Sequence, residues 1–333
     1  MFPSVDMNST ANDLSFSTAQ IIPLATFCLL VATTGLLGNS VVLYSSFRYN
    51  AVCLDKISVI LVRNLALADI MYCICTVLPL TVTYLTRRYI LGGVYCFIMA
   101  HIAFIPGTVN NLTILTISCH RLRALSAPLT FRGISLNGAY YLVAVIWFFS
   151  TGGTVISLAY HSQAVFVPSA ARCLSTVYTN PAAASTFGTI FILFVVIPVV
   201  LTTIFNLIML YHVYKRSGIR GHCPRRFKGL VTVFVLSGLF TLSLTPFTIF
   251  TFMHLTDKVK VPRSLDLMAF HFIFLNVFGN PIMYTFTNRR FGEYVKGMIS
   301  GIILSFNRGH QPKSTLKISD IYSSKNTDQE TSI

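Results

Sequence analysis

Seven apolar runs dominate this sequence and constrain its fold more than any other feature. They cover approximately residues 20–46, 58–84, 94–122, 138–160, 187–214, 229–253 and 265–286. A helix needs about 20 apolar residues to cross the hydrocarbon core of a bilayer. Because lipid offers no partner to backbone amides, such runs must form helices rather than loops. Charged residues make up 11% of the chain, whereas soluble domains contain about 25%. The sequence therefore predicts an all-α membrane protein, a seven-transmembrane helix bundle.

Lysine and arginine are unevenly divided between the two sets of loops that seven spans create. One set, together with the adjoining ends of the spans and the C-terminal tail, holds 19 of the 25 basic residues. The alternate set holds six: Arg87, Arg88, Arg172, Lys258, Lys260 and Arg263. Cytoplasmic loops carry the excess of basic residues in membrane proteins. We therefore expect a multi-pass plasma-membrane protein with an extracellular N-terminus and a cytoplasmic C-terminus. The net charge of +15 is then explained by topology, and we expect membrane lipid but no nucleic acid among the partners.

The segments outside the seven runs divide the rest of the chain. Residues 1–19 are expected to form an extracellular N-terminus, in which Asn8 opens a glycosylation acceptor sequence. Residues 20–286 form the seven-transmembrane bundle. Residues 287–303 carry basic and aromatic positions that suit a short amphipathic eighth helix on the membrane surface. Residues 304–333 are expected to be a disordered cytoplasmic tail.

The eight cysteines permit one pair in an oxidising compartment. Four lie within the apolar runs and two lie in loops that face the reducing cytosol: Cys28, Cys73, Cys75 and Cys119, and then Cys53 and Cys223. The remaining two are at outer positions: Cys96 at the outer end of the third run, and Cys173 in the loop between the fourth and fifth runs. We therefore predict a disulfide between them, which would hold the long loop between helices 4 and 5 against the start of helix 3. The chain-entropy model assigns such a bridge about 4 kcal/mol.

Asp69 lies deep within the second apolar run. An acid at the centre of a spanning helix costs about 2.5–3.5 kcal/mol on insertion scales, so it should face the bundle interior and have polar partners. Because several polar partners are available in the other spans, we expect Asp69 to have an ion-binding or switching role; the alternative is a buried carboxyl group that only fixes packing. Two prolines should also disturb their helices, Pro106 beside Gly107 in the third run and Pro246 in the sixth.

An ordered set of residues, with one signature for each predicted span, resembles the rhodopsin-like (class A) G-protein-coupled receptors over residues 20–300. The set consists of Gly38-Asn39, LALAD at 65–69, Cys96, Arg121, Trp147, Cys173, Pro198, Pro246 and NPIMY at 280–284. The resemblance implies a receptor, not an enzyme, that binds an extracellular ligand. It also implies that a heterotrimeric G protein is activated through movement of helix 6.

The resemblance also implies roles for individual residues. The G-protein coupling triplet would be His120, Arg121 and Leu122. The activation switch would comprise Leu244, Pro246, Asn280, Pro281 and Tyr284. An allosteric sodium ion, the one cofactor that the family implies, would be held by Asp69, Asn110, Asn276 and Asn280. Carboxylate and amide oxygens suit such a hard cation.

The sequence departs from the family pattern at positions that control activation. The usual acid-Arg-Tyr triplet has His120 in place of the acid, and the aromatic residue of helix 6 is replaced by Leu244. Asn206 stands where helix 5 usually carries a tyrosine. Arg225 and Arg226 stand at the foot of helix 6, where many family members carry an acid that pairs with the arginine of helix 3. Histidine is mostly neutral at pH 7 and cannot substitute for the carboxylate. We therefore predict raised basal signalling or a lower barrier to activation.

A metal site at the adjacent Cys119 and His120 is disfavoured. Neighbouring side chains point about 100° apart around a helix, and the sequence places no further ligands nearby. Cys119 is therefore interpreted as a small residue that faces either lipid or the bundle.

The ligand class is narrowed by three positions. Ala103 replaces the aspartate of amine receptors, and Phe274 occupies the site of the lysine that binds retinal. The basic outer loops favour an anionic or lipid-like ligand, although contact with lipid headgroups and glycans explains them equally well. A distant likeness to the melatonin and medium-chain fatty-acid receptor branch makes Arg172 a candidate partner for a ligand carboxylate. The alternatives are a receptor-like scaffold that binds ligand without coupling to G protein, and a transporter, for which no internal repeat is found.

Overall fold

The computed structural model describes residues 13–48, 56–126, 135–160, 163–175, 181–217, 226–256 and 261–287, with short helical pieces between 292 and 301. The chain divides into two compact units, one ending at Gly292 and one beginning at Glu293. Asn8 and the tail from residue 304 lie outside the described residues. Of the proposed eighth helix, residues 292–293, 295–297 and 300–301 are described, and they are helical. The domain boundaries therefore stay predictions.

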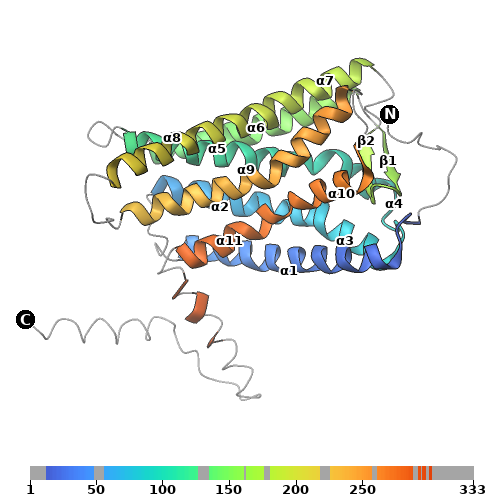
Figure 1. The fold of residues 1–333 in the computed structure, drawn as a ribbon, viewed down its shortest axis with the longest axis horizontal. Helices are drawn as coiled ribbons and strands as arrows, with labels where there is room; N and C mark the ends of the chain where they lie inside the picture. Colours follow the sequence, from blue (N-terminus) through green and yellow to red (C-terminus); the bar gives the residue numbers. More distant parts are fainter. Residues whose placement is uncertain are drawn as a thin grey trace, which may run out of the picture. The chain divides into compact units, whose positions relative to one another are not determined.

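All seven predicted runs lie in helices. The elements are α1 (Thr18–Arg48), α2 (Lys56–Tyr72), η1 (Cys73–Val77), α3 (Leu78–Thr86), α4 (Gly92–Phe97), η2 (Ile98–Ile102), α5 (Phe104–Ser126), α6 (Leu136–Tyr160), α7 (Pro181–Phe191), η4 (Ile192–Val196), α8 (Ile197–Ser217), α9 (Arg226–Thr256), α10 (Arg263–Phe272) and α11 (Leu275–Thr287). Six spans among the described residues are long and apolar enough to cross a membrane, and α9 is a further helix of 31 residues. The long helices lie side by side in one bundle (Figure 1), so the predicted seven-helix fold is confirmed.

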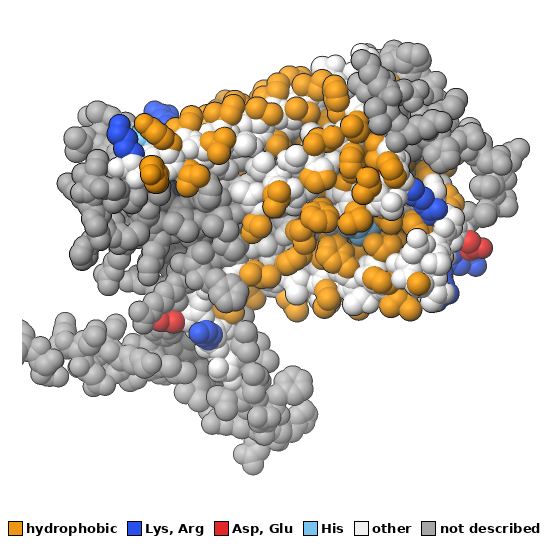
Figure 2. Space-filling model, in the orientation of Figure 1, with side chains coloured by type: hydrophobic (Ala, Val, Ile, Leu, Met, Phe, Trp, Pro, Cys, Tyr) orange, Lys and Arg blue, Asp and Glu red, His pale blue; other side chains and the backbone are white. Residues whose placement is uncertain are grey.

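The bundle has an apolar exterior and a partly polar interior. Large hydrophobic side chains point outward, among them Leu37, Tyr141 and Phe148, each at least 70% exposed. Figure 2 shows hydrophobic side chains spread along the visible flank of the bundle. In contrast, Asn39 and Asp69 are completely buried. This distribution suits a surface that faces lipid tails, because burying apolar groups between helices gains nothing over leaving them in lipid.

Three π-helical turns lie within the described part of the spans, and each precedes a proline. The segments are η1 before Pro79, η2 before Pro106 and η4 before Pro198. Proline has no N–H for the carbonyl four residues earlier, and its ring clashes with that carbonyl, so the hydrogen-bond ladder shifts. The predicted irregularity of the third span is therefore present, but it lies at Ile98–Ile102, ahead of Pro106 rather than at Pro106-Gly107.

The last span is divided by a turn at residues 273–274 and is fastened to α1. Pro281 lies inside α11 and leaves the carbonyl of Val277 without its helical donor. The side-chain amide of Asn39 donates to this carbonyl at 2.7 Å. The backbone of Gly38 approaches Pro281 so closely that a Cβ atom would lie 2.7 Å from the proline Cγ. The Gly38-Asn39 pair is therefore a packing site between the first and last spans.

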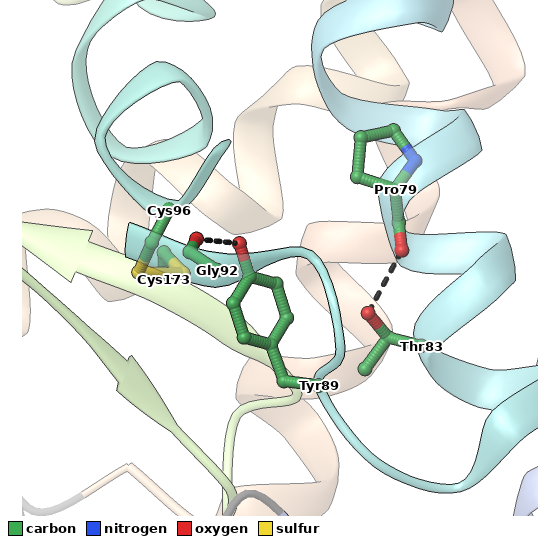
Figure 3. Close-up of a disulfide and its surroundings, with 6 residues drawn as sticks. All are labelled: Pro79, Thr83, Tyr89, Gly92, Cys96 and Cys173. Atoms are coloured by element: carbon green, nitrogen blue, oxygen red, sulfur yellow. Dashed lines mark hydrogen bonds between the residues drawn. A yellow bond between two sulfur atoms is a disulfide. The ribbon is translucent and has the colours of Figure 1, made fainter. Parts of the chain in front are cut away.

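The long loop between α6 and α7 contains an antiparallel hairpin that the sequence did not predict. Strand β1 (Ala164–Val167) pairs with β2 (Arg172–Ser175), and Cys173 lies opposite Phe166. The predicted disulfide between Cys96 and Cys173 is present (Figure 3). Beside it, the ring of Tyr89 stacks on Phe166 at a centroid distance of 4.6 Å. We call the end of the bundle that carries this bridge the disulfide end.

Tyr89 closes the connection between α3 and α4 next to the disulfide. Its hydroxyl donates to the carbonyl of Gly92 at 2.9 Å (Figure 3). A tyrosine is already protonated at neutral pH, and burial raises the pKa of Tyr89 further, to about 12, so the phenol remains a donor. The loop is thus held to the hairpin by stacking and to its own backbone by a hydrogen bond.

Candidate functional site

A cavity of about 250 Å³ lies beside the hairpin at the disulfide end. Residues of α5, α7, α9, α10 and β2 contribute to its wall. Much of the lining is aromatic, including Phe104, Phe187, Phe191, Phe247 and Phe270. The cavity is therefore suited to a ligand with an apolar body, because most of the surface that such a ligand would bury against is hydrocarbon.

A compact cluster of ionisable side chains, which contains one ion pair, faces this cavity. Arg172 from β2 pairs with Asp266 from α10, with 3.1 Å between Nη2 and Oδ2. His254 from α9 approaches the other carboxylate oxygen at 3.4 Å. All three line the cavity, and the side chains of Arg172 and Asp266 are only 9% and 17% exposed. The cluster therefore links the hairpin to the ends of two transmembrane segments.

The guanidinium group of Arg172 has one further contact and one open donor. Its central carbon lies 4.2 Å from the ring centroid of Phe270, a cation–π arrangement. Its Nη1 atom is buried and has no hydrogen-bond partner among the described residues. A buried donor without a partner is unfavourable. A ligand acceptor that hydrogen-bonds to this atom would therefore be stabilised.

Sequence reasoning identified Arg172 but missed Asp266 and His254. Asp266 lies just inside the predicted seventh run, at its boundary with the basic outer loop, where an acid is easily assigned to the loop. The sequence offered one signal for this ion pair: Asp266 at the end of one span, and Arg172 next to Cys173 of the predicted disulfide. Nothing in the linear sequence says that the hairpin brings them together.

Ala103 and Phe274, the positions that argue against amine and retinal ligands, are both buried. Ala103 is buried and lines the cavity, so the cavity has no acid at this point. Phe274 is completely buried and packs edge-on against Tyr72 and Phe270. Its environment is that of an aromatic core residue.

Asp69 lies in a polar cluster within the bundle. Asn110 from α5 donates to its Oδ1 atom and Asn280 from α11 donates to Oδ2, both at 2.7 Å. Asp69 is completely buried, and the Oδ1 atom of Asn110 has no partner among the residues described. A carboxylate and a neighbouring amide oxygen are ligands that a hard cation accepts. These residues therefore fit the predicted sodium site.

Asn276, the fourth predicted sodium ligand, has a different partner. Its Oδ1 atom accepts a hydrogen bond from Ser243 of α9 at 2.8 Å. In α8, Asn206 accepts a similar bond from Ser237 of α9, also at 2.8 Å. Neutral hydrogen bonds thus connect α9 to the helices on both sides of it.

The predicted switch residues of α9 and α11 lie along the bundle interior. Leu244 is buried, lines the cavity and packs with Phe191 and Phe240. Pro246 lies inside α9, which continues through it. Pro281 meets Gly38, as described above. The side chain of Tyr284 lies outside the described residues.

The predicted coupling residues lie in the last turns of α5, at the end away from the disulfide. His120 is buried and Leu122 is half-buried. The Nη2 atom of Arg121 donates to the Ser58 hydroxyl of α2 at 2.9 Å. Arg225 and the side chain of Arg226 lie outside the described residues. Arg121 is therefore connected to the second span through a neutral partner.

The remaining family signatures are interhelical contacts. The indole of Trp147 in α6 donates to Asn64 of α2 at 2.7 Å, and Asn64 donates to Thr113 of α5 at 2.7 Å. The side-chain amide of Asn111 donates at 2.7 Å to the carbonyl of Phe194, which Pro198 deprives of its helical donor. These residues hold neighbouring helices together.

These features are typical of seven-transmembrane receptors: a seven-helix bundle, a hairpin that a disulfide holds beside a cavity, and a buried cluster of Asp and Asn side chains. The model of the family described as "7 transmembrane receptor (rhodopsin family)" matches residues 38–284, so the chain belongs to this family. It is therefore a multi-pass membrane receptor of a family that signals through G proteins, and this family is one of receptors rather than enzymes.

Individual relatives agree with this assignment. The chain is 26% identical to a purinoceptor of Meleagris gallopavo over 86% of its own length and 74% of the relative's. It is 28% identical to a melanopsin of Rutilus rutilus over 45% of its length, a match that spans 28% of the melanopsin. The crystal structure of squid rhodopsin superimposes with a TM-score of 0.73 at 16% identity, covering 96% of this chain and 93% of the rhodopsin. The likeness to the melatonin and medium-chain fatty-acid receptor branch is not confirmed.

Proposed function

We propose that this protein is a plasma-membrane receptor for an extracellular ligand with an apolar body and an anionic head. The proposal rests on one observation: Arg172 is buried in the wall of a largely aromatic cavity, and its Nη1 atom has no hydrogen-bond partner among the described residues. Aromatic lining suits the body of such a ligand, and the planar guanidinium fork suits its head. The basic outer loops would raise the local concentration of an anion. With the loops that carry the excess of basic residues in the cytoplasm, the disulfide end and the N-terminus are extracellular.

Amines and retinal are disfavoured as ligands. Ala103 offers no negative charge to an amine, and Phe274 cannot form the Schiff base that retinal requires. The likeness to melanopsin and to squid rhodopsin supports the fold and family. However, this chain has Phe274 at the position where a retinal-binding lysine would be needed. The purinoceptor name belongs to the relative, and we do not propose a purine ligand from it.

Ligand binding would activate a heterotrimeric G protein through movement of helix 6, here α9. Two neutral bonds, Ser237–Asn206 and Ser243–Asn276, would have to break or shift when α9 moves. Arg121, flanked by His120 and Leu122, would then meet the G protein. Because His120 replaces the family's acid, Arg121 would leave its inactive position more easily, and basal activity would be raised.

Sodium would favour the inactive state through Asp69, Asn110 and Asn280. The buried carboxylate and the open Asn110 oxygen support this assignment. Asn276 would join them only if it gave up its bond to Ser243. The ion would supply positive charge in the middle of the bundle and would hold α2, α5 and α11 together.

A ligand screen with a nucleotide-exchange readout tests the receptor function. Full-length protein in nanodiscs would be combined with a panel of heterotrimeric G proteins and screened against amphiphilic anions. We expect at least one compound to accelerate exchange in wild type and to lose its effect in Arg172→Ala. Arg263→Ala, which removes a basic residue of the same end that does not line the cavity, serves as the matched control. Ligand binding without exchange on any G protein would instead identify a non-coupling scaffold.

A further inference from the structure

The cavity already contains a carboxylate that occupies Arg172. Asp266 holds Nη2 of the guanidinium group at 3.1 Å, and both side chains are largely buried. Removing one member of a buried ion pair is strongly unfavourable, because the other charge is left without compensation. Arg172 therefore needs a negative partner at all times, and in this structure the protein itself provides it.

An external anion cannot use Arg172 fully while Asp266 stays in place. The open Nη1 atom offers a single donor, whereas carboxylates bind arginine best through two parallel hydrogen bonds. The negative charge of Asp266 would also repel the arriving anion in a site that is poorly screened by water. Both obstacles disappear when the incoming anion takes the place of Asp266.

Asp266 has a second partner to which it can remain bound. His254 contacts the Oδ1 atom, which is not the oxygen that Arg172 contacts. Asp266 is also the more exposed of the ion pair, at 17% against 9% for Arg172. Leaving Arg172 would therefore not strand the aspartate in a dry, unpartnered position.

We propose that Asp266 is an internal competitor that determines which ligands Arg172 accepts. The ligand class is an aromatic or aliphatic amphiphile with a monoanionic carboxylate head, which replaces Asp266 on the guanidinium group. The number of carboxylates on Arg172 is the same before and after the exchange, so the guanidinium charge stays compensated, and the released Asp266 keeps its contact with Nε2 of His254. A neutral amide cannot replace the aspartate, and an amine is repelled by Arg172. This inference rests on the proposed function, because it assumes that the cavity is the ligand site.

The exchange is tested with three soluble probes that share one aromatic body: phenylbutyrate, phenylbutyramide and phenylbutylamine. Their affinities for the purified full-length protein in nanodiscs are measured from the shift in thermal unfolding midpoint with probe concentration. Asp266→Asn removes the competing charge, and Asp266→Ser does so with a different side chain in case one variant does not fold. Asp266→Glu keeps the charge. Asp13→Asn removes an exposed acid of the same end, whose carboxylate lies 3.9 Å from Arg88.

We expect Asp266→Asn and Asp266→Ser to bind phenylbutyrate about tenfold more tightly than wild type, since like charges in a buried site are costly. Affinity for the amide should be unchanged in the neutral variants, Asp266→Glu should show no such gain because it keeps the competing charge, and Asp13→Asn should behave as wild type. Arg172→Gln should lose phenylbutyrate binding. The inference is overturned if the neutral variants gain no affinity, if the amide gains as much as the carboxylate, or if no variant binds phenylbutyrate.

The failure of this inference is distinguishable from failure of the proposed function. Loss of binding in Arg172→Gln with no gain in Asp266→Asn would remove the competitor role and leave Arg172 as the ligand partner. Binding that is indifferent to both residues would remove both proposals.

Discussion

The side-chain amide of Asn39 in α1 donates a 2.7 Å hydrogen bond to the carbonyl of Val277 in α11. Pro281 is the reason that this carbonyl is available, because proline cannot supply the N–H that a helix would place there. In a bilayer no water can take over this role, so one polar side chain repairs a defect in a neighbouring helix. A second case is Asn111, which serves the carbonyl of Phe194 ahead of Pro198.

Replacing Asn39 by Leu should destabilise the bundle by about 1–3 kcal/mol, because it leaves a buried carbonyl without a donor. The measurement is the thermal unfolding midpoint of purified protein in detergent. Thr33→Val is the control, since the Thr33 hydroxyl bonds only to carbonyls of its own helix. Equal midpoints for Asn39→Leu and the control would contradict the structural role.

Gly38→Ala should also destabilise the bundle, by about 1–3 kcal/mol, as expected for overpacking. The added methyl would lie 2.7 Å from Cγ and 2.8 Å from Cβ of Pro281. Gly152→Ala in α6 is the matched control, because nothing lies within 4 Å of a Cβ at that position. The same unfolding measurement should show a loss for the first variant and none for the second.

Ser237→Ala and Ser243→Ala should each raise basal nucleotide exchange roughly two- to tenfold, the range that corresponds to one net hydrogen bond. Each variant removes a bond that ties α9 to α8 or to α11. Thr245→Val removes a hydroxyl that bonds to Thr241 within α9, so it should leave basal exchange unchanged. If all three variants match wild type, these bonds do not restrain α9.

His120→Asp should lower basal exchange, because a carboxylate beside Arg121 would hold the arginine in its inactive position. The comparison is ligand-free exchange by wild type and variant at equal receptor density. Cys119→Ser, at the preceding position, tests whether a polar change nearby has the same effect. Equally low exchange in wild type and His120→Asp would reject the prediction of raised basal signalling.

Sodium chloride should raise the unfolding midpoint of ligand-free protein relative to choline chloride of equal concentration. Asp69→Asn should abolish the difference, because the amide lacks the charge that a cation needs. Asn276→Ala should keep most of it, since Asn276 bonds to Ser243 rather than to the Asp69 cluster. A wild-type midpoint that is the same in both salts would exclude the ion.

Much of the fold was predictable because its determinants are local. Apolar runs long enough to cross a bilayer have one stable backbone form, so the spans could be placed from the sequence within a few residues. The disulfide followed from topology, since Cys96 and Cys173 were the cysteines left at outer positions. The π-helical turns were missed, although Pro79 and Pro198 signalled two of them.

The candidate site was only half predictable, because its members come from segments far apart in the chain. The sequence by itself determined the spans, the family, the disulfide and the presence of Arg172 and Asp69. The tertiary structure decided that Arg172 pairs with Asp266 and His254, and that Asn276 turns to Ser243 rather than to Asp69. Helix rotation and the path of the hairpin set these pairings. Both depend on the packing of the whole bundle, which no local pattern of residues specifies.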